Sequence, residues 1–318
     1  MEKHVFGPVP SRRLGRSIGI NNIPPKVCSY SCSYCQVGKA IRMQIKRQPF
    51  YPPEMLVKEV RQLLQQLQPT DVYPDYLTIV PDGEPTLDSQ LGALITQLKQ
   101  FNIKIAVIIN GSLLYMPDVR EDLLQADYVS FKTDSVVESV WRKINKPLKQ
   151  LQLNTILDGI SAFATEYKGT LVTETMLLKD INDNHESLEQ TAEFIQTLNP
   201  AIAYLGIPTR PTAMMDAFPA EEETVNIAYH LFQTKLRCVE LLTGYEGNAF
   251  SSTGNFEEDI LSITAVHPMR EDAVVVLLNK TMSSVERLNK LLDKQMLKKV
   301  YYQNSIYYVR RFPSTSYR

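Results

Sequence analysis

Three cysteines stand within eight residues of one another, in the order Cys28-Ser-Tyr-Ser-Cys32-Ser-Tyr-Cys35. The spacing C-x3-C-x2-C lets three thiolates from one loop bind three irons of a cubane cluster, while the fourth iron stays open for another ligand. A structural zinc ion normally takes four protein ligands, and the nearest histidine, His4, is distant in the sequence. The spacing therefore predicts an iron–sulfur cluster bound by Cys28, Cys32 and Cys35.

A second group of residues suited to ligand binding is the turn Pro81-Asp82-Gly83-Glu84-Pro85-Thr86, which follows the apolar run Tyr76–Val80. A glycine lets the backbone approach a ligand closely, and the carboxylate of a glutamate suits a cation. A β-turn rich in Asp, Gly and Pro would contain the same residues for structural reasons alone. Taken alone, the stretch favours a purely structural turn. The nearby cysteine cluster is the reason for preferring a cation-binding site.

Other polar side chains lie in or just after further apolar runs. If these runs are parallel strands, their carboxyl ends meet at one edge of the sheet, where ligands bind in barrels and in open α/β sheets. Helix capping at the following turns would explain most of these residues singly. The residues are Asn110, Ser112, Lys132, Asp134, Glu174 and Arg210.

The elements that must position these residues alternate along the chain. Between Arg16 and about residue 240, short runs rich in β-branched residues alternate with helical patterns such as Pro53–Leu67, where Leu56, Val60 and Leu63 share one face. This alternation predicts βαβ units and a parallel sheet. Six units can be counted. The predicted fold is α/β, a partial (β/α)6 barrel of the TIM type, and a doubly wound open sheet is the alternative.

The expected elements can be given as residue ranges. Strands are expected at Ser17–Ile20, Tyr76–Val80, Ile103–Ile109, Tyr128–Lys132, Thr170–Leu178, Ala203–Ile207 and Cys238–Leu242. Helices are expected at Pro53–Leu67, Ser89–Phe101, Leu148–Ala164, His185–Leu198 and Ala220–Thr234.

The pattern changes near Gly244–Gly254, where glycines and hydroxyl residues predict a boundary between a barrel domain, residues 1–250, and a second domain, residues 256–318. Three short helices are expected there, followed by two strands joined as a hairpin, which is the outline of a winged helix-turn-helix. The helices are expected at Glu257–Thr264, Asp272–Leu278 and Ser284–Leu292, and the strands at Leu297–Tyr302 and Ile306–Arg311.

Charge is distributed unevenly, although the net charge of the 318 residues is only −1. Residues 1–50 hold nine basic side chains and one acid, and the segment from Asn279 onward holds nine basic side chains and two acids. Basic ends on a nearly neutral chain indicate local patches for an anionic partner, or merely solvated charge. Arg12, Arg13 and Arg210 are the candidate substrate-binding residues.

The cysteine spacing, with Tyr34 as the aromatic of C-x3-C-x-aromatic-C, resembles the signature of the radical S-adenosylmethionine (radical SAM) superfamily. The resemblance implies a [4Fe–4S] cluster whose open iron binds S-adenosyl-L-methionine (AdoMet), and reductive cleavage of AdoMet to a 5′-deoxyadenosyl radical. It also implies that Gly83 and Glu84 contact the AdoMet ammonium, although Asp82 replaces the family's first glycine. Further cofactor contacts are implied for Tyr34, Asn110, Ser112, Asp134 and Glu174, and an electron donor of flavodoxin or ferredoxin type is expected.

Within the superfamily, the chain is similar to the branch of the tRNA wyosine-base synthases. The similarity rests on Phe6-Gly-Pro-Val-Pro-Ser-Arg-Arg-Leu14, Gly83-Glu-Pro-Thr-Leu87, Asn110-Gly-Ser-Leu-Leu114 and Val266-His-Pro-Met-Arg-Glu-Asp272. Those enzymes bind a second cluster through further cysteines near the N-terminus, and this chain has no cysteine before Cys28. Catalytic candidates are Lys132, as a Schiff-base lysine, and Cys238, which a buried core position would also explain.

Three functions are compatible with these features. The first is modification of RNA, with tRNA as the leading substrate, which the winged helix would bind through its basic and tyrosine side chains. The second is maturation of a peptide or protein, and the third is an iron–sulfur redox sensor that binds DNA. The second domain could also be only a structural lid. No apolar run reaches the roughly 18 residues of a membrane span, so a cytoplasmic protein without membrane contact is expected.

Overall fold

The computed structural model describes residues 3–68, 73–214, 216–243, 252, 254–266, 268–302 and 304–311. Its main feature is an eight-stranded sheet whose strands follow one another in sequence order. All neighbouring pairs in this sheet are parallel except the first, β1 with β2. The strands are β1 (Val5–Ser11), β2 (Gly15–Ile20), β5 (Tyr76–Ile79), β6 (Lys104–Ile109), β7 (Tyr128–Lys132), β8 (Thr170–Met176), β9 (Ile202–Gly206) and β10 (Val239–Leu242).

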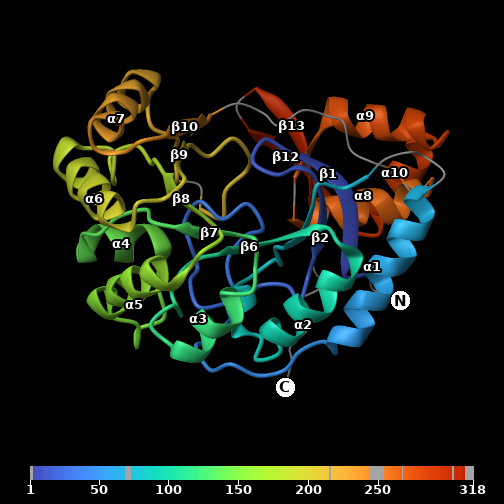
Figure 1. Ribbon diagram of the computed structural model, residues 1–318. Helices are drawn as coiled ribbons and strands as arrows, with labels where there is room; N and C mark the ends of the chain where they lie inside the picture. The colour runs from blue at the N-terminus through green and yellow to red at the C-terminus, as the bar shows by residue number, and fades with distance from the viewer. Residues whose placement is uncertain are drawn as a thin grey trace.

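Seven α-helices connect these strands and follow one another in an arc around the outside of the sheet (Figure 1). A doubly wound sheet reverses its strand order, so the sequential order and the arc favour the barrel-type α/β arrangement over that alternative. The helices are α1 (Pro53–Leu67), α2 (Leu91–Leu98), α3 (Pro117–Leu123), α4 (Glu138–Asn145), α5 (Leu153–Glu166), α6 (His185–Leu198) and α7 (Glu222–Lys235), with 3-10 turns at Pro85–Leu87 and Lys99–Phe101.

The two faces of the sheet carry different side chains, because successive residues of a strand point to opposite faces. In β7, Val129 and Phe131 pack into the apolar core under the helices. Tyr128 instead belongs to a cluster with Leu14 and Tyr204. The residues that share its face, Ser130 and Lys132, are polar, so the concave face becomes progressively polar toward the carboxyl ends of the strands.

The expected strands and long helices are present, with ends displaced by a few residues at most positions. The helix expected from Leu148 begins only at Leu153. Strand β1 was not expected, because it contains Gly7, Pro8 and Pro10. Proline is tolerated in edge strands, and β1 is the edge of this sheet. Helices α3 and α4, of seven and eight residues, are too short for a clear helical period.

The C-terminal region forms a unit of three helices and a three-stranded antiparallel sheet with its own apolar core. The three helices and the hairpin match the expected ranges closely, whereas the two-residue strand β11 is too short to be visible in a sequence pattern. Most of the expected boundary, near Gly244–Gly254, lies outside the described residues. The elements are α8 (Phe256–Val266), β11 (Met269–Arg270), α9 (Glu271–Lys280), α10 (Val285–Asp293), β12 (Leu297–Tyr302) and β13 (Ser305–Arg310).

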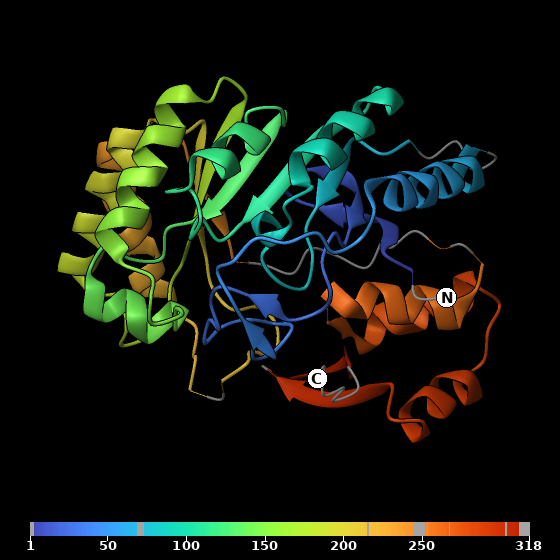
Figure 2. The same ribbon diagram turned by 90° about the horizontal axis from the view of Figure 1, so that it is seen from below.

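This C-terminal unit packs against the first edge of the large sheet. Val9 of β1 contacts its core, and two tyrosines of the hairpin reach the loop after β9. Tyr302 donates its hydroxyl hydrogen to the Pro208 carbonyl at 3.0 Å, and Tyr307 donates to the Thr209 carbonyl at 3.1 Å. Figure 2 shows the C-terminal sheet beside the segment that carries the cysteines. Within the described residues, no helix is long and apolar enough to cross a membrane.

Candidate cofactor site

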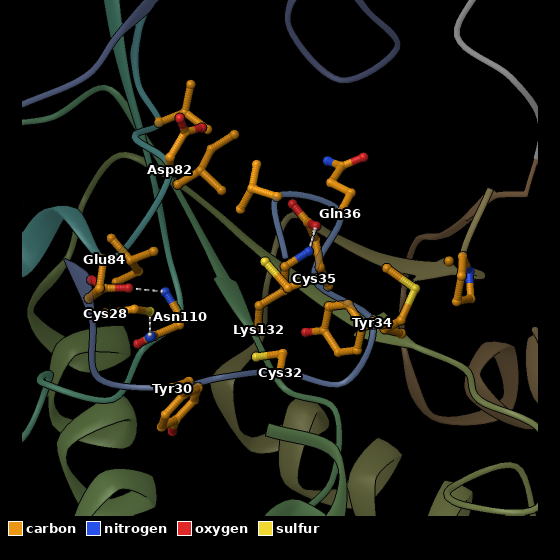
Figure 3. Close-up of a pocket in the computed structure, with 18 of the residues that line it drawn as sticks. Cys28, Tyr30, Cys32, Tyr34, Cys35, Gln36, Asp82, Glu84, Asn110 and Lys132 are labelled. Carbon is orange, nitrogen blue, oxygen red and sulfur yellow. Dashed lines mark hydrogen bonds and ion pairs between the residues drawn. The ribbon is translucent and has the colours of Figure 1, made fainter. Parts of the chain in front are cut away.

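A cavity of about 320 Å³ lies at the carboxyl ends of the strands, and all three clustered cysteines line it (Figure 3). They are free thiols on the segment that follows β2, where Cys28 ends the two-residue strand β3 (Val27–Cys28), which pairs with β4 (Arg42–Met43). Burial, and after it the neighbouring Glu84 carboxylate, raise the pKa of the Cys28 thiol to about 12. Burial also raises the pKa of Cys32 and of Cys35. Protons must therefore leave these thiols when a metal centre binds.

The cysteine loop and the Gly83-Glu84 turn are joined directly through their backbones. The Lys26 amide donates to the Asp82 carbonyl at 2.6 Å, and the Glu84 amide donates to the Val27 carbonyl at 3.1 Å. A Cβ atom on Gly83 would lie only 2.0 Å from the Val27 carbonyl oxygen. Glycine is therefore required at this position for the two segments to stay in contact.

Glu84 is buried and lines the cavity. One carboxylate oxygen accepts hydrogen bonds from Thr86, and the other accepts one from the Asn110 amide at 2.7 Å. Burial raises the pKa of Glu84 to about 7, against the lowering effect of these hydrogen bonds. A carboxylate that is buried this deeply gains from a cationic partner, and it has lone pairs left to accept one.

Asn110 links this turn to the cysteine loop. Its side-chain amide donates to the Ser29 hydroxyl at 2.8 Å and approaches the Cys28 Sγ at 3.6 Å. Ser112 was expected in the cofactor site, but its hydroxyl bonds to that of Ser29 at 2.6 Å, and Ser112 does not line the cavity. Ser112 therefore contacts the cysteine loop through Ser29, on the side away from the cavity.

Asp134, another expected cofactor residue, also lies outside the cavity lining. Its carboxylate accepts hydrogen bonds from the Tyr34 hydroxyl at 2.5 Å, the Asn145 amide at 2.6 Å and the Met176 backbone at 2.9 Å. The Asn145 amide also lies 3.4 Å from the Cys32 Sγ. Tyr34 and Asp134 therefore hold Asn145 against a cysteine, while Tyr34 itself lines the cavity.

Glu174 lies in the cavity wall and is engaged by three protein groups. Its carboxylate forms ion pairs with Lys132 and Arg13 and accepts a hydrogen bond from the Ser130 hydroxyl at 2.6 Å. Burial and the nearby Arg13 lower the pKa of Lys132 to about 8. The β1–β2 turn thus brings an arginine into the cavity lining, where it pairs with Glu174, which in turn pairs with Lys132.

The remaining expected residues are divided. Arg12 and Arg210 line the cavity, and Arg210 is buried and donates to the Gln36 side chain at 3.1 Å. Cys238 directly precedes β10, is partly exposed and does not line the cavity. It is therefore not the fully buried core residue that the sequence offered as an alternative.

Several residues of the site were not expected. Lys26, Gln36 and Asn145 belong to the cysteine loop and to the end of α4, so no local pattern assigns them to the site. The basic residue Lys26, two positions before the first cysteine, was the most accessible signal. The tyrosines Tyr302 and Tyr307 were expected to meet a nucleic acid, but the structure places their hydroxyls on the loop of residues 208–209.

The donor set fits an iron–sulfur cluster. Three thiols from one loop line a single cavity, and thiolates are the ligands that such clusters prefer. Two side-chain amides, from Asn110 and Asn145, already direct N–H groups toward Cys28 and Cys32. Hydrogen bonds of this kind to cysteine sulfur are a common means of tuning a bound cluster.

Comparisons with known proteins agree with this chemistry. A family model described as "Radical SAM superfamily" matches residues 22–195. UPF0026 protein MJ1312 of Methanocaldococcus jannaschii is 46% identical over 311 residues, which cover 97% of this chain and 96% of that protein.

Two solved structures share the fold at low sequence identity. A structure of TYW1 with a lysine–pyruvate adduct bound is 17% identical, with a TM-score of 0.54, over 70% of this chain and 76% of that one. SuiB of Streptococcus suis bound to precursor peptide SuiA is 13% identical, with a TM-score of 0.51, over 70% of this chain and 48% of that one. The family model covers more than half of the chain and the archaeal relative nearly all of it, so this chain belongs to the radical SAM superfamily and is an enzyme.

Proposed function

We propose that this enzyme holds a [4Fe–4S] cluster through Cys28, Cys32 and Cys35 and binds AdoMet beside it. The observation that carries the proposal is the placement of Glu84 in the same cavity as the three thiols. When bound, the cluster supplies the electron that cleaves AdoMet reductively to methionine and a 5′-deoxyadenosyl radical. A wyosine-type reaction is not part of the proposal, because the cysteines for a second cluster are missing from residues 1–27.

The side chains that line the cavity have distinct proposed roles. Glu84 accepts the ammonium group of AdoMet, Gly83 allows the backbone to approach it, and Asn110 keeps the Glu84 carboxylate oriented. Tyr34 and Glu174 form part of the wall around the cofactor. Ser112 and Asp134 act from behind the loop, through Ser29 and Asn145.

Lys132 is the stronger of the two catalytic candidates. It lines the cavity with its amine beside Glu174, and its lowered pKa makes the neutral amine accessible near neutral pH. Cys238 lies outside the cavity lining. A role for it in the reaction would need a movement of β10, so we favour Lys132.

We further propose that the chain has a barrel domain, residues 1–250, and a winged-helix domain, residues 256–318. The order helix, strand, helix, helix, strand, strand in the C-terminal unit supports this proposal, because a winged helix-turn-helix combines such helices with a terminal hairpin. The contact of the hairpin with the loop after β9 makes this unit part of the active-site surroundings.

RNA, with tRNA as the leading candidate, is the proposed substrate, and a flavodoxin- or ferredoxin-type protein is the proposed electron donor. The RNA substrate is supported by the charge of the cavity lining, in which basic side chains outnumber acidic ones. The basic residues are Arg12, Arg13, Lys26, Lys132 and Arg210, and the acidic residues are Asp82, Glu84 and Glu174. The fold shared with SuiB keeps a peptide substrate as the second candidate. A DNA-binding redox sensor is disfavoured, since the chain is an enzyme.

The test compares substrates on anaerobically reconstituted protein that has been reduced with dithionite and supplied with AdoMet. We expect total RNA to increase 5′-deoxyadenosine formation several-fold and to contain a modified nucleoside afterwards, both measured by mass spectrometry. RNA digested to nucleosides before the reaction is the control. If intact RNA leaves the rate of 5′-deoxyadenosine formation unchanged and a peptide fraction from cell extract raises it, the result supports a peptide substrate instead.

A further inference from the structure

The segment of residues 37–48, which follows the cysteines, has an unusual charge. It holds four basic side chains and no acidic one. No acidic residue occurs anywhere between Glu2 and Glu54, so the segment has no acidic neighbour nearby in the chain. Only contacts formed by folding can therefore neutralise these four basic side chains.

Folding neutralises one of the four and leaves the other three at the surface. Arg47 forms ion pairs with Asp118 and Asp122, and its side chain is only 8% exposed. The other three are Lys39, Arg42 and Lys46. They are exposed, and no carboxylate in the described part of the chain forms an ion pair with them. A structural role thus explains Arg47 but none of the other three.

An apolar side chain lies between these charges in the chain. Ile41 is 56% exposed, whereas Ile45 packs against the apolar core of the barrel. A large exposed apolar side chain flanked by Lys39 and Arg42 has the composition of a small protein–protein interface, with an apolar centre and a polar rim. Interfaces with nucleic acids are more polar. The segment therefore fits an acidic protein better than it fits RNA.

The segment is bonded directly to the strand that carries the first cysteine. β3 and β4 are parallel, with Cys28 opposite Met43, and Figure 2 shows this small sheet in blue. The Gln44 amide donates to the Cys28 carbonyl at 3.1 Å, and the Ile41 amide donates to the Lys26 carbonyl at 3.0 Å. Paired strands lie about 4.8 Å apart, so little more than one strand separates Cys28 from a protein seated on the segment. Electron transfer requires such proximity, whereas RNA binding does not.

We propose that Lys39, Ile41, Arg42 and Lys46 form the docking surface for an acidic one-electron donor protein. The basic side chains attract the donor over a distance and orient it, and Ile41 is covered on contact. One electron leaves the reduced flavin or iron–sulfur centre of the donor and reduces the cluster, and no atom or proton is transferred. The inference rests on the proposed function, because the electron is of use only if the three cysteines hold a cluster.

The test uses the reconstituted full-length protein under anaerobic conditions and two probes of net negative charge, a flavodoxin and a ferredoxin. Calorimetry measures binding of the oxidised probes, and stopped-flow absorbance follows cluster reduction by the reduced probes. Dithionite is a small reductant that needs no docking surface, so it shows whether a variant still holds a reducible cluster.

Two variants and one control are compared. The variants are the double substitution Arg42→Glu/Lys46→Glu and the single substitution Ile41→Ser. Lys99→Glu is the matched control, because Lys99 is also exposed. It lies beside Tyr76 and Thr170, at the amino ends of β5 and β8 and thus at the end of the sheet opposite the cavity.

We expect the double variant to lower the second-order rate constant for cluster reduction by the probes at least about tenfold at low ionic strength, because electrostatic attraction is lost. The difference should shrink as salt is added, since exposed charges are screened. Ile41→Ser should weaken binding about threefold to tenfold, as loss of an interface centre does, with little change in the salt dependence. Reduction by dithionite in every variant, and both measurements in Lys99→Glu, should stay within about twofold of wild type.

Three results overturn the docking surface. The first is unchanged binding and reduction by both probes in the double variant. The second is a wild-type protein that dithionite reduces but neither probe binds. The third is an equal loss with dithionite and with the probes in both variants, which shows damage to the cysteine loop. An RNA stem-loop that binds the double variant less tightly, while both probes are unaffected, assigns the surface to RNA and contradicts the proposal.

Formation of 5′-deoxyadenosine separates this inference from the proposed function. A protein that the probes reduce in the expected pattern, but that forms no 5′-deoxyadenosine from AdoMet, keeps the docking surface and loses AdoMet cleavage. A protein that forms 5′-deoxyadenosine with dithionite, but whose variants respond to the probes as wild type does, keeps AdoMet cleavage and loses the docking surface.

Discussion

The cysteine loop lines the cavity, whereas the C-terminal sheet contacts the loop of residues 208–209 that also lines it, and the two are held there in different ways. The loop is tied to α4 by the Ser31 amide, which donates to Asn145, and by the Ser33 amide, which donates to the Ile144 carbonyl at 2.8 Å. The sheet reaches the cavity rim through two tyrosine hydroxyls. Buried backbone bonds hold a site to the small tolerances that chemistry requires, whereas side-chain contacts at a rim can be changed without loss of the fold.

Chemistry and recognition should therefore be separable by mutation. Changes in the loop and its supports should affect the cofactor and every reaction that depends on it. Changes in the C-terminal sheet should affect only the response to substrate.

Gly83→Ala should have the largest effect, because its Cβ atom would lie 2.0 Å from the Val27 carbonyl oxygen. Overpacking of this kind costs about 1–3 kcal/mol, and the turn and the cysteine loop must move apart. We expect lower iron content after reconstitution and loss of AdoMet binding, measured by iron assay and calorimetry. Wild-type iron content and AdoMet binding in Gly83→Ala would contradict the close approach.

Glu84→Gln should weaken AdoMet binding strongly and remove its pH dependence. Because burial raises the pKa of Glu84 to about 7, the side chain is mostly protonated at about pH 6 and mostly ionised at about pH 8. Only the ionised form pairs with an ammonium group, so wild-type affinity should rise over this interval. Calorimetry at the two pH values measures the effect. The same slope in Glu84→Gln would show that another group controls it.

Asn145→Leu should shift the properties of the bound cluster without abolishing it. The Asn145 amide lies 3.4 Å from the Cys32 Sγ, and an N–H donor to thiolate stabilises the reduced, more negative cluster. Its loss should make the midpoint potential more negative in a titration monitored by electron paramagnetic resonance. Tyr34→Phe, which removes a different donor to Asp134, should change the potential less. A potential that only Tyr34→Phe alters would contradict the role of Asn145.

Tyr302→Phe should have the smallest effect. It removes the hydrogen bond from the Tyr302 hydroxyl to the Pro208 carbonyl. A hydrogen bond of this kind typically contributes about 1 kcal/mol to stability. We expect AdoMet cleavage without substrate to stay at the wild-type rate, while stimulation by RNA falls about twofold to fivefold as the hairpin docks less firmly. Measured 5′-deoxyadenosine with and without RNA gives both values. A fall in the RNA-free rate would break the separation between chemistry and recognition.

The fold and the centre of the site could be predicted from the sequence because both leave local patterns. The cysteine spacing, the Gly83-Glu84 turn after an apolar run, and helix α1 are contiguous in the chain. Strand β1 was missed because its prolines are acceptable only at a sheet edge, and edge position is a property of the whole fold.

The supports of the site could not be predicted for a related reason. Asn145 is 113 residues from Cys32, so only the folded chain brings the two together. Ser112 and Asp134 follow the ends of β6 and β7 but lie outside the cavity lining. The direction in which each side chain points depends on the packing of the cysteine loop, so the sequence pattern could not place them behind that loop.

Reductive cleavage of AdoMet in the cavity is tested most directly by 5′-deoxyadenosine formation. Anaerobically reconstituted protein is given dithionite and AdoMet, and the product is measured by mass spectrometry. We expect 5′-deoxyadenosine with the wild-type protein and none with Cys32→Ala. A wild-type protein that assembles its cluster and yet neither binds nor cleaves AdoMet would contradict the proposed function.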